Sequence, residues 1–218
     1  ARVGATVVDG REWLLFQAVP AFELFTGHGA PVPTMRKALW KTRKDGRTNI
    51  ALIGFMGSGK SAVAEAMGRR TGMAVIDIDT NIEKKAGCSV AEIFERKGEK
   101  AFRSMEVEEV DGLRFVSNTV VSCGGGVVVS RPNVRVLRNN CVTVWLWAGI
   151  DTSLRRIGET GSRPLLHRVD EAGAEALLRG RYPLYASTCD LLVNTEGKGP
   201  EEIAMRIHDE TRNNAVRR

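Results

Sequence analysis

Several features that define special classes of protein are absent or scarce in this 218-residue sequence. It has four cysteines and no CxxC pair, so neither a zinc ribbon nor a redox dithiol is indicated, and we expect reduced thiols. No apolar run approaches the roughly 18 residues of a membrane-spanning helix, and the first residues lack the basic and then apolar layout of a signal peptide. We therefore expect a cytoplasmic protein with no membrane partner.

Excess charge of one sign is also scarce outside one short segment. The net charge is +6, but residues 36–47 contain six Lys or Arg and one Asp and so account for five of the six charges. A basic run this short, between two patterned regions, is typical of a solvated linker, which we place at residues 41–47. We therefore expect no nucleic-acid partner.

The sequence does contain enough apolar material for one substantial core, with 43% hydrophobic and 27% charged residues. Five short apolar runs are the expected strands, at residues 50–53, 73–76, 119–122, 141–147 and 189–193. Helical patterns lie between or after them, including residues 61–71, 100–115 and 203–211. Apolar strands separated by helices predict a three-layer α/β domain with a parallel sheet and right-handed crossovers.

The first 40 residues have a different pattern. Residues 11–25 place apolar side chains at helical spacing, Gly27 and Gly29 end this run, and residues 31–39 suggest a second short helix. A segment of this length cannot bury such a surface alone, so it needs the other domain, a partner or further chain to cover it. We expect a short N-terminal helical arm.

A phosphate-binding loop is the clearest motif. Residues 54–61, GFMGSGKS, fit G-x-x-x-x-G-K-[ST], follow an apolar strand and begin a helix. The glycines let backbone N–H groups face phosphate oxygens, Lys60 adds positive charge toward the β- and γ-phosphates, and Ser61 can bind magnesium. The residues expected to bind ATP here are Gly57, Ser58, Gly59, Lys60, Ser61 and Ala62.

Two carboxylates follow the next expected strand. Asp77 and Asp79, in VIDID, lie at the carboxyl end of this strand, which is the ligand edge of a parallel sheet. One carboxylate can hold the magnesium shell while the other accepts a proton or hydrogen bond from an acceptor hydroxyl. The alternative for Asp79 is that it only caps the following helix.

Three further features point to a small ligand. Arg103 has Glu106 at i+3 on the same helix, where the carboxylate can orient the guanidinium. Three glycines at residues 124–126 follow the third strand, so bare backbone can approach a ligand closely. Residues 161–166, GSRPLL, interrupt two helical stretches, as a mobile lid carrying Arg163 would. Together with the phosphate-binding loop, these features predict a small-molecule kinase.

Residues 48–212 resemble the shikimate kinase family. The resemblance lies in GFMGSGKS, VIDIDTNIE, SVAEIFERKGEKAFRSMEVEEV, GGG, SRPLL and RYPLY, which occur in the family's order. It implies a P-loop kinase fold with a five-stranded parallel sheet and a mobile lid. It also implies transfer of the γ-phosphoryl group of MgATP to the 3-hydroxyl of shikimate, giving shikimate 3-phosphate, on the route to chorismate and the aromatic amino acids.

The same resemblance implies roles for single residues. Asp77 matches the magnesium-side aspartate, and Asp79 matches the aspartate that binds shikimate hydroxyls and is the candidate general base. Arg163 matches the lid arginine that meets ATP phosphates, Arg156 the arginine that stacks on adenine, and Lys198 a residue at the adenine edge. The other expected substrate-binding residues are Phe94, Arg103, Gly124, Gly125, Gly126 and Arg181. The expected catalytic residues are Lys60, Asp79 and Arg163, and the expected metal-binding residues are Ser61 and Asp77.

The opening segment resembles the extreme C-terminal end of shikimate dehydrogenase, in which a glutamine matching Gln17 contacts shikimate. That family's nicotinamide-binding glycine loop and its catalytic Lys and Asp are absent from this sequence. We therefore expect residues 1–40 to be a remnant of a dehydrogenase-like domain, joined to a kinase domain at residues 48–218. A dehydrogenase domain covalently fused to the kinase in a longer protein is the expected partner.

Two alternatives stay open on the sequence alone. Another P-loop small-molecule kinase, for gluconate or a nucleotide, would share the phosphate-binding loop, although gluconate kinases place a histidine shortly after the second aspartate and residues 80–83 are TNIE. A non-catalytic nucleotide-binding module would show losses at Lys60, Asp79 or Arg103, yet all three are present.

Overall fold

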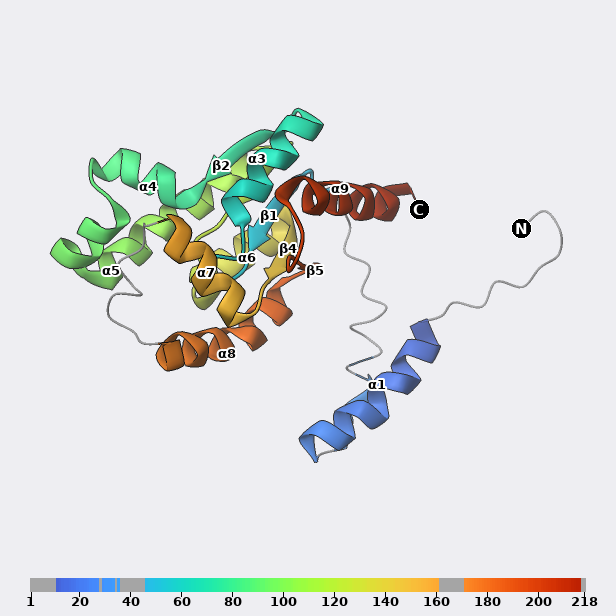
Figure 1. Cartoon of the computed structure of the whole chain (residues 1–218). Helices are drawn as coiled ribbons and strands as arrows, with labels where there is room; N and C mark the ends of the chain where they lie inside the picture. The colour runs from blue at the N-terminus through green and yellow to red at the C-terminus, as the bar shows by residue number, and fades with distance from the viewer. Residues whose placement is uncertain (1–10, 28, 34, 36–45, 161–170, 217–218) are drawn as a thin grey trace. The chain divides into compact units, whose positions relative to one another are not determined.

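The computed structural model describes residues 11–27, 29–33, 35, 46–160 and 171–216. The chain divides into two compact units, Ala1–Asp45 and Gly46–Arg218. The second unit contains the sheet and most of the helices (Figure 1). No helix among the described residues is long and apolar enough to cross a membrane.

A five-stranded parallel sheet forms the centre of the second unit. Its strand order is β2-β3-β1-β4-β5, so β1 pairs with both β3 and β4. The strands are β1 (Asn49–Ile53), β2 (Ala74–Asp77), β3 (Thr119–Ser122), β4 (Cys141–Trp147) and β5 (Leu191–Asn194). The predicted fold class is therefore confirmed, and all five strands lie within one or two residues of the predicted runs.

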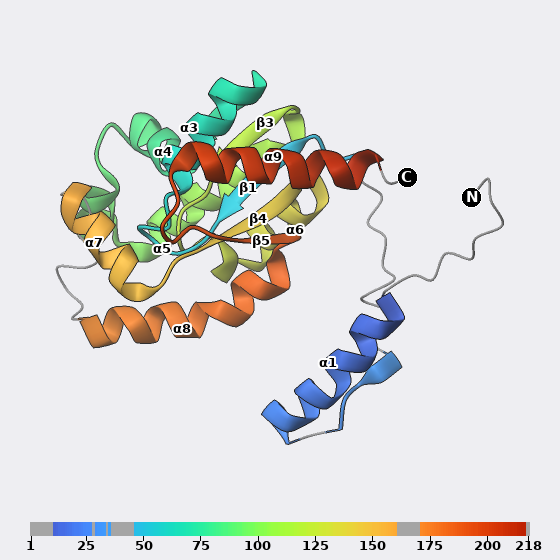
Figure 2. The same cartoon turned by 45° about the vertical axis from the view of Figure 1, so that its right-hand side comes forward.

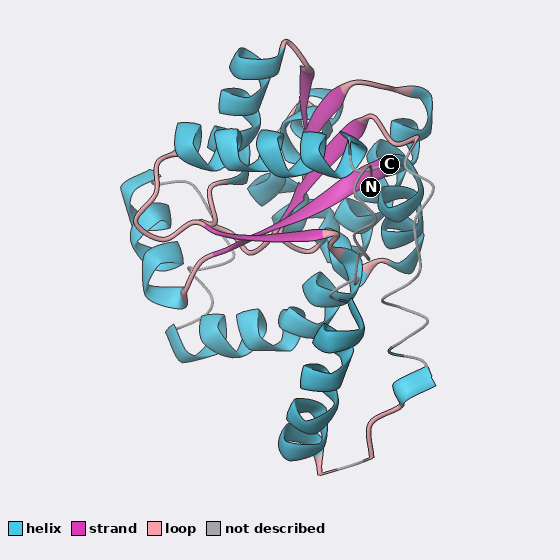
Figure 3. Cartoon of the chain, turned by 90° about the vertical axis from the view of Figure 1, so that its right-hand side faces the viewer, coloured by secondary structure: helices cyan, strands magenta, loops and turns pink. Residues whose placement is uncertain are grey.

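Helices cover both faces of the sheet (Figures 2 and 3). They are α3 (Lys60–Thr71), α4 (Ile78–Ala86), α5 (Val90–Asp111), α6 (Arg131–Asn140), α7 (Ile150–Thr160), α8 (Glu171–Thr188) and α9 (Pro200–Val216). On β1, Ile50 and Leu52 pack in one apolar cluster with α3 and α9, whereas Ala51 and Ile53 pack in a second cluster with α5, α6 and α8. Because successive side chains of a strand point to opposite faces, these two clusters are the interfaces of a three-layer structure.

Helix α5 is longer than predicted and is interrupted at Gly98. It begins ten residues earlier than the predicted start at residue 100, after a capping box formed by Ser89 and Glu92. Gly98 has φ 77° and ψ 170°, which breaks the helical pattern and explains why only the later part was predicted. The last predicted residues form the short 3-10 helix Gly112–Phe115.

The first unit contains α1 (Arg11–Thr26), in agreement with the predicted helix at residues 11–25. Gly27 follows α1 with φ 69°, and its N–H donates to the carbonyl of Glu23 at 2.9 Å. A glycine in this left-handed conformation commonly ends a helix. Residues 32, 33 and 35 of the predicted second helix are helical, and the rest of that segment lies outside the described residues.

The end of the predicted linker contacts the folded domain. Nη1 of Arg47 donates to the carbonyl of Cys141 at 2.6 Å and to Oδ2 of Asp190 at 2.9 Å, and its side chain is only 7% exposed. Arg47 therefore belongs to the second unit, whereas residues 41–45 of the predicted linker lie outside the described residues.

None of the four cysteines forms a disulfide, in line with the expected thiols. Burial raises the pKa of the Cys123 thiol well above its usual range and that of Cys141 to about 12, so both stay protonated at neutral pH.

Candidate active site

The phosphate-binding loop runs from the end of β1 to the first turn of α3. Gly54, Gly57 and Gly59 have φ values of 146°, 73° and 89°, which favour glycine. A Cβ atom on Gly54 would lie 2.4 Å from the carbonyl oxygen of Leu146, and one on Gly57 would lie 2.3 Å from that of Ser153. The loop therefore needs these glycines for its backbone conformation and for its close approach to β4 and α7.

Lys60 is the first residue of α3 and folds back over this loop. Its Nζ donates a 2.8 Å hydrogen bond to the carbonyl of Phe55, and the residue is buried. Ser58 is buried in the loop, whereas Ser61 and Ala62 are exposed in the first turn of the helix. An ammonium group and the N-terminus of a helix thus lie together, which is an arrangement that binds phosphate.

Oxygen ligands suited to magnesium lie beside the loop. The hydroxyl of Ser61 donates to Oδ2 of Asp77 at 2.8 Å and lies 3.2 Å from the hydroxyl of Ser122. Mg²⁺ is usually held by one or two protein oxygens together with substrate phosphates, so these residues fit a magnesium ion that arrives with ATP. Oδ1 of Asp77 also accepts from the N–H of Thr80 and caps α4, so the alternative of Asp79 as the helix cap is wrong.

The three glycines after β3 lie against the expected substrate-binding side chains. A Cβ atom on Gly124 would lie 2.8 Å from Oδ1 of Asp79 and 3.0 Å from Oε1 of Glu106. One on Gly126 would lie 2.4 to 2.7 Å from three atoms of the Arg103 guanidinium. Any larger residue at either position would displace a charged group, so these glycines allow an anion-binding side chain and two carboxylates to converge.

Gly125 holds a third expected residue through its carbonyl. This oxygen accepts hydrogen bonds from Nη1 of Arg181 at 3.3 Å and from the hydroxyl of Tyr185 at 2.5 Å, both from α8. The guanidinium of Arg181 also lies 6.0 Å from the centre of the Phe55 ring in the phosphate-binding loop. Burial raises the pKa of Tyr185 to about 12, so its hydroxyl keeps the proton that it donates.

Arg103 is held by two glutamates of its own helix. Its Nη1 donates to both carboxylate oxygens of Glu106 at 3.1 Å, and its Nε and Nη2 donate to Glu99 at 3.2 and 3.1 Å. Its guanidinium also lies 5.3 Å from the ring centre of Phe102, and that ring is 4.8 Å from the ring of Phe94. The expected aromatic residue Phe94 therefore lies one ring away from the expected arginine.

Glu106 is the one fully buried carboxylate among the groups just described, with a side chain that is 0% exposed. Burial raises its pKa, nearby Arg103 and Arg181 lower it, and the neighbouring carboxylate of Asp79 raises it. Nδ2 of Asn133 also donates to Glu106 at 3.3 Å. The orientation of Arg103 thus depends on a buried charge that other elements must stabilise.

Arg156 connects the phosphate-binding loop to the segment after β5. Its guanidinium donates to the carbonyl of Gly57 at 3.3 Å and to both the hydroxyl and the carbonyl of Thr195, at 3.1 and 2.9 Å. Lys198 lies in the same segment and donates to the carbonyl of Glu196 at 3.3 Å. The two residues expected at the adenine therefore belong to neighbouring parts of the molecule.

A comparison with known families supports this arrangement. A family model described as shikimate kinase matches residues 56–212, which is more than half of the chain. The chain belongs to the shikimate kinase family. A shikimate kinase of Moorella thermoacetica is 41% identical over 161 residues, covering 74% of this chain and 92% of that protein. A second family model, for the C-terminal domain of shikimate 5'-dehydrogenase, matches residues 10–39, as the resemblance of the opening segment predicts.

Solved structures agree with this family assignment. A shikimate kinase of Acinetobacter baumannii in complex with shikimate has a TM-score of 0.74 and 30% identity, covering 78% of this chain and 96% of that one. A deoxyadenosine kinase of M. mycoides has a TM-score of 0.53 and 14% identity, with 76% and 99% of the chains covered, and so shares the fold alone. These values favour shikimate kinase over the nucleotide-kinase alternative.

Most of the residues expected from the shikimate kinase resemblance lie in two groups. Asp79, Arg103 and Arg181 surround the three glycines, whereas Lys60, Ser61 and Asp77 lie at the phosphate-binding loop. Arg163, the expected lid residue, lies outside the described residues.

Sequence reasoning missed three contacts in this shikimate kinase domain. Tyr185 lies within the RYPLY stretch, but nothing in that stretch indicates that its hydroxyl binds Gly125. Asn133 contacts Glu106 from 27 residues away, and Thr195 contacts Arg156 from 39 residues away. Polar residues near helix ends and strand ends are common, so the sequence alone does not indicate that Asn133 and Thr195 contact these side chains.

Proposed function

We propose that this chain transfers the γ-phosphoryl group of MgATP to the 3-hydroxyl of shikimate, giving shikimate 3-phosphate. The observation that carries the proposal is the convergence of Asp79, Arg103 and Arg181 on the bare backbone of residues 124–126. Family membership supports the same reaction, since the curated relatives are shikimate kinases.

The chemistry of shikimate fits these side chains. Shikimate is an anionic cyclohexene triol, and arginine offers a planar, permanently charged donor pair to a carboxylate. Arg103 and Arg181 would bind that carboxylate, while Asp79 would accept a hydrogen bond from the hydroxyl that is phosphorylated. In a loose transition state the hydroxyl loses its proton late, so Asp79 acts mainly by orienting this hydroxyl and takes the proton at the end. Phe94 would form an apolar wall of the same pocket.

The nucleotide would bind on the other side of residues 124–126. The backbone of residues 57–62 and the ammonium of Lys60 would hold the phosphates, and Arg156 and Lys198 would lie at the adenine. Ser61 and Asp77 would hold Mg²⁺, which neutralises charge on the β- and γ-phosphates when it is bound. Arg163 remains the expected lid residue that contacts the γ-phosphate.

For the rest of the chain we propose a remnant of a dehydrogenase-like domain at residues 1–40, a linker at residues 41–45 and the kinase domain at residues 46–218, because Arg47 packs against the kinase domain. The family match over residues 10–39 supports the first of these, and it also supports a fused dehydrogenase domain in a longer protein. We further propose a cytoplasmic location, which agrees with four cysteines that form no disulfide.

A coupled assay for ADP release tests the proposed reaction. With saturating MgATP, shikimate should elicit turnover, whereas gluconate and nucleosides should not exceed the background rate. Lys60→Met is the matched negative control because it removes the charge beside the phosphates and leaves the shikimate site intact. Turnover with another polyol, together with none with shikimate, would contradict the proposal.

A further inference from the structure

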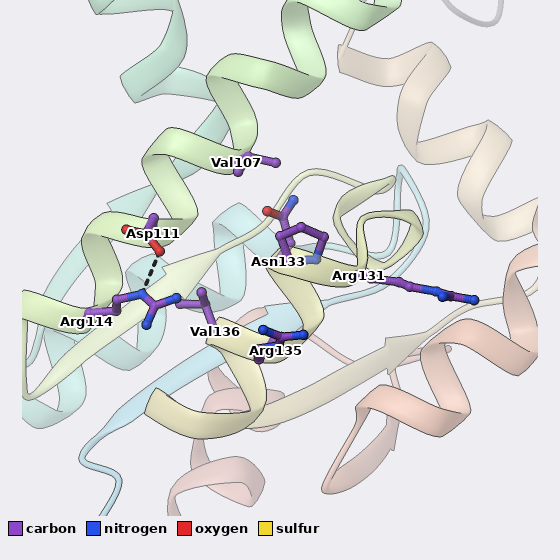
Figure 4. A pocket seen from close by; sticks show the side chains of 8 residues that line it. Val107, Asp111, Arg114, Arg131, Asn133, Arg135 and Val136 are labelled. Atoms are coloured by element: carbon purple, nitrogen blue, oxygen red, sulfur yellow. Dashed lines mark hydrogen bonds and ion pairs between the residues drawn. The ribbon is translucent and has the colours of Figure 1, made fainter.

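Asn133 connects helix α6 to the buried carboxylate behind the shikimate site. It is 1% exposed, and its Nδ2 donates to Oε2 of Glu106 at 3.3 Å. Figure 4 shows the Asn133 side chain directed toward α5, the helix that carries Glu106. The side chain of Arg131, which like Asn133 is on α6, extends away from α5. Oε2 of Glu106 is also one of the two oxygens that receive Nη1 of Arg103. A single carboxylate thus joins the amide of Asn133 to the guanidinium of Arg103.

The Asn133 side chain binds Glu106 through its nitrogen, but its buried oxygen lowers the stability of the fold. Oδ1 of Asn133 is buried and accepts no hydrogen bond from any of the described residues. A buried carbonyl oxygen without a partner destabilises a fold, and an apolar side chain of the same size would avoid this loss. The N-cap of α6 is Ser130, so capping does not account for the Asn133 side chain either. The remaining role of this side chain is the hydrogen bond that its Nδ2 donates to the carboxylate of Glu106.

Neutral donors matter at Glu106 because the charges around it are mixed. Arg103 from α5 and Arg181 from α8 favour the carboxylate form, whereas Asp79 from α4 and burial oppose it. Cys123, which follows β3, is fully protonated at neutral pH and contributes no charge. From α6, Asn133 supplies a hydrogen bond to the charged form without adding a charge of its own.

We propose that Asn133 is a positioning residue of this kinase, which holds the Glu106 carboxylate in the orientation that presents Arg103 to the substrate carboxylate. The inference rests on the proposed function, since it takes Arg103 as a shikimate ligand. Asn133 also lines a surface hollow of about 300 Å³ between α5 and α6, together with apolar residues such as Val107 and Val136 and charged residues such as Asp111 and Arg131.

Asn133→Leu is the first test, because leucine keeps the volume and removes the donor. We expect the shikimate KM to rise about fivefold or more, with the MgATP KM and the melting temperature little changed. The matched control is Asn49→Leu, which replaces another buried asparagine that bonds to the carbonyls of Val116 and Asn140, away from Glu106. This control should lower the melting temperature and leave the shikimate KM unchanged.

A pH profile separates positioning from a structural role. Loss of the Asn133 donor removes stabilisation of the charged form of Glu106 and raises its pKa further, so the acidic limb of kcat/KM for shikimate should move to higher pH in Asn133→Leu. In Asn133→Asp, two facing carboxylates share one proton. A proton held between the two carboxylates at lower pH relieves their repulsion and restores a donor where the amide stood. The kcat/KM of this variant should therefore rise as the pH falls, opposite to the leucine variant.

The outcomes distinguish this proposal from the proposed function. If the wild-type protein does not phosphorylate shikimate, the proposed function fails, and the inference fails with it. If wild type is active and Arg103→Lys raises the shikimate KM, but Asn133→Leu and Asn133→Asp match wild type in KM and pH profile, the inference alone is overturned. Should Asn133→Leu not fold, the Asn133→Asp profile decides, and a profile parallel to that of wild type contradicts the proposal.

Discussion

Gly126→Ala is the substitution whose effect follows most directly from the geometry. The added Cβ would lie 2.4 Å from Nη2, 2.6 Å from Nη1 and 2.7 Å from Cζ of Arg103, whereas ordinary contacts begin at 3.4 Å. The guanidinium must therefore move by about 1 Å, which breaks its two 3.1 Å hydrogen bonds to Glu106. A misplacement of that size costs roughly 100-fold in rate. We expect kcat/KM for shikimate to fall by about that factor.

The same substitution should leave the fold and the nucleotide site intact. The clashing atoms belong to the end of a long side chain that can move, so the melting temperature and the MgATP KM should stay near wild type. Gly158→Ala is the matched control, because a Cβ atom there meets nothing within 4 Å on α7. Steady-state kinetics with each substrate varied in turn would measure both effects. A shikimate kcat/KM within twofold of wild type for Gly126→Ala would refute the reasoning.

Three other substitutions test single steps of the account. Asp79→Ala should abolish phosphoryl transfer while MgATP affinity, measured by calorimetry, stays within about twofold of wild type; near-normal turnover would remove its assigned role. Arg103→Lys should raise the shikimate KM by more than about tenfold, or about 1.4 kcal/mol, because lysine cannot offer a planar donor pair. An unchanged KM would mean that Arg181 alone binds the shikimate carboxylate. Arg47→Met should destabilise the kinase domain by about 2 kcal/mol in urea unfolding, since it removes a largely buried ion pair to Asp190, and unaltered stability would contradict this.

The positions of the strands along the chain and of the phosphate-binding loop could be predicted because they depend on local patterns, whereas the strand order β2-β3-β1-β4-β5 depends on pairing between distant segments. The buried strands have continuous apolar runs, and the loop motif has a fixed spacing that only one backbone conformation satisfies. The sequence placed Asp79 after the second strand and the three glycines after the third, and the pairing of β2 with β3 brings both to one edge of the sheet.

Features that depend on contacts between distant segments could not be predicted in this way. β5 begins at Leu191 rather than at residue 189, because the N–H of Cys189 still bonds to Tyr185 at the end of α8. Asp190 accepts hydrogen bonds from the N–H and hydroxyl of Thr143 on β4, which no local pattern indicates. The contact between Asn133 and Glu106 is of the same kind, since it requires α5 and α6 to pack side by side.

Identification of the product tests the central claim most directly. The wild-type chain, incubated with shikimate and MgATP, should convert shikimate to a single monophosphate, and a two-dimensional ¹H–³¹P correlation spectrum should connect the new phosphorus resonance to the proton at carbon 3. Phosphorylation at another hydroxyl, or release of inorganic phosphate with shikimate unchanged, would contradict the account.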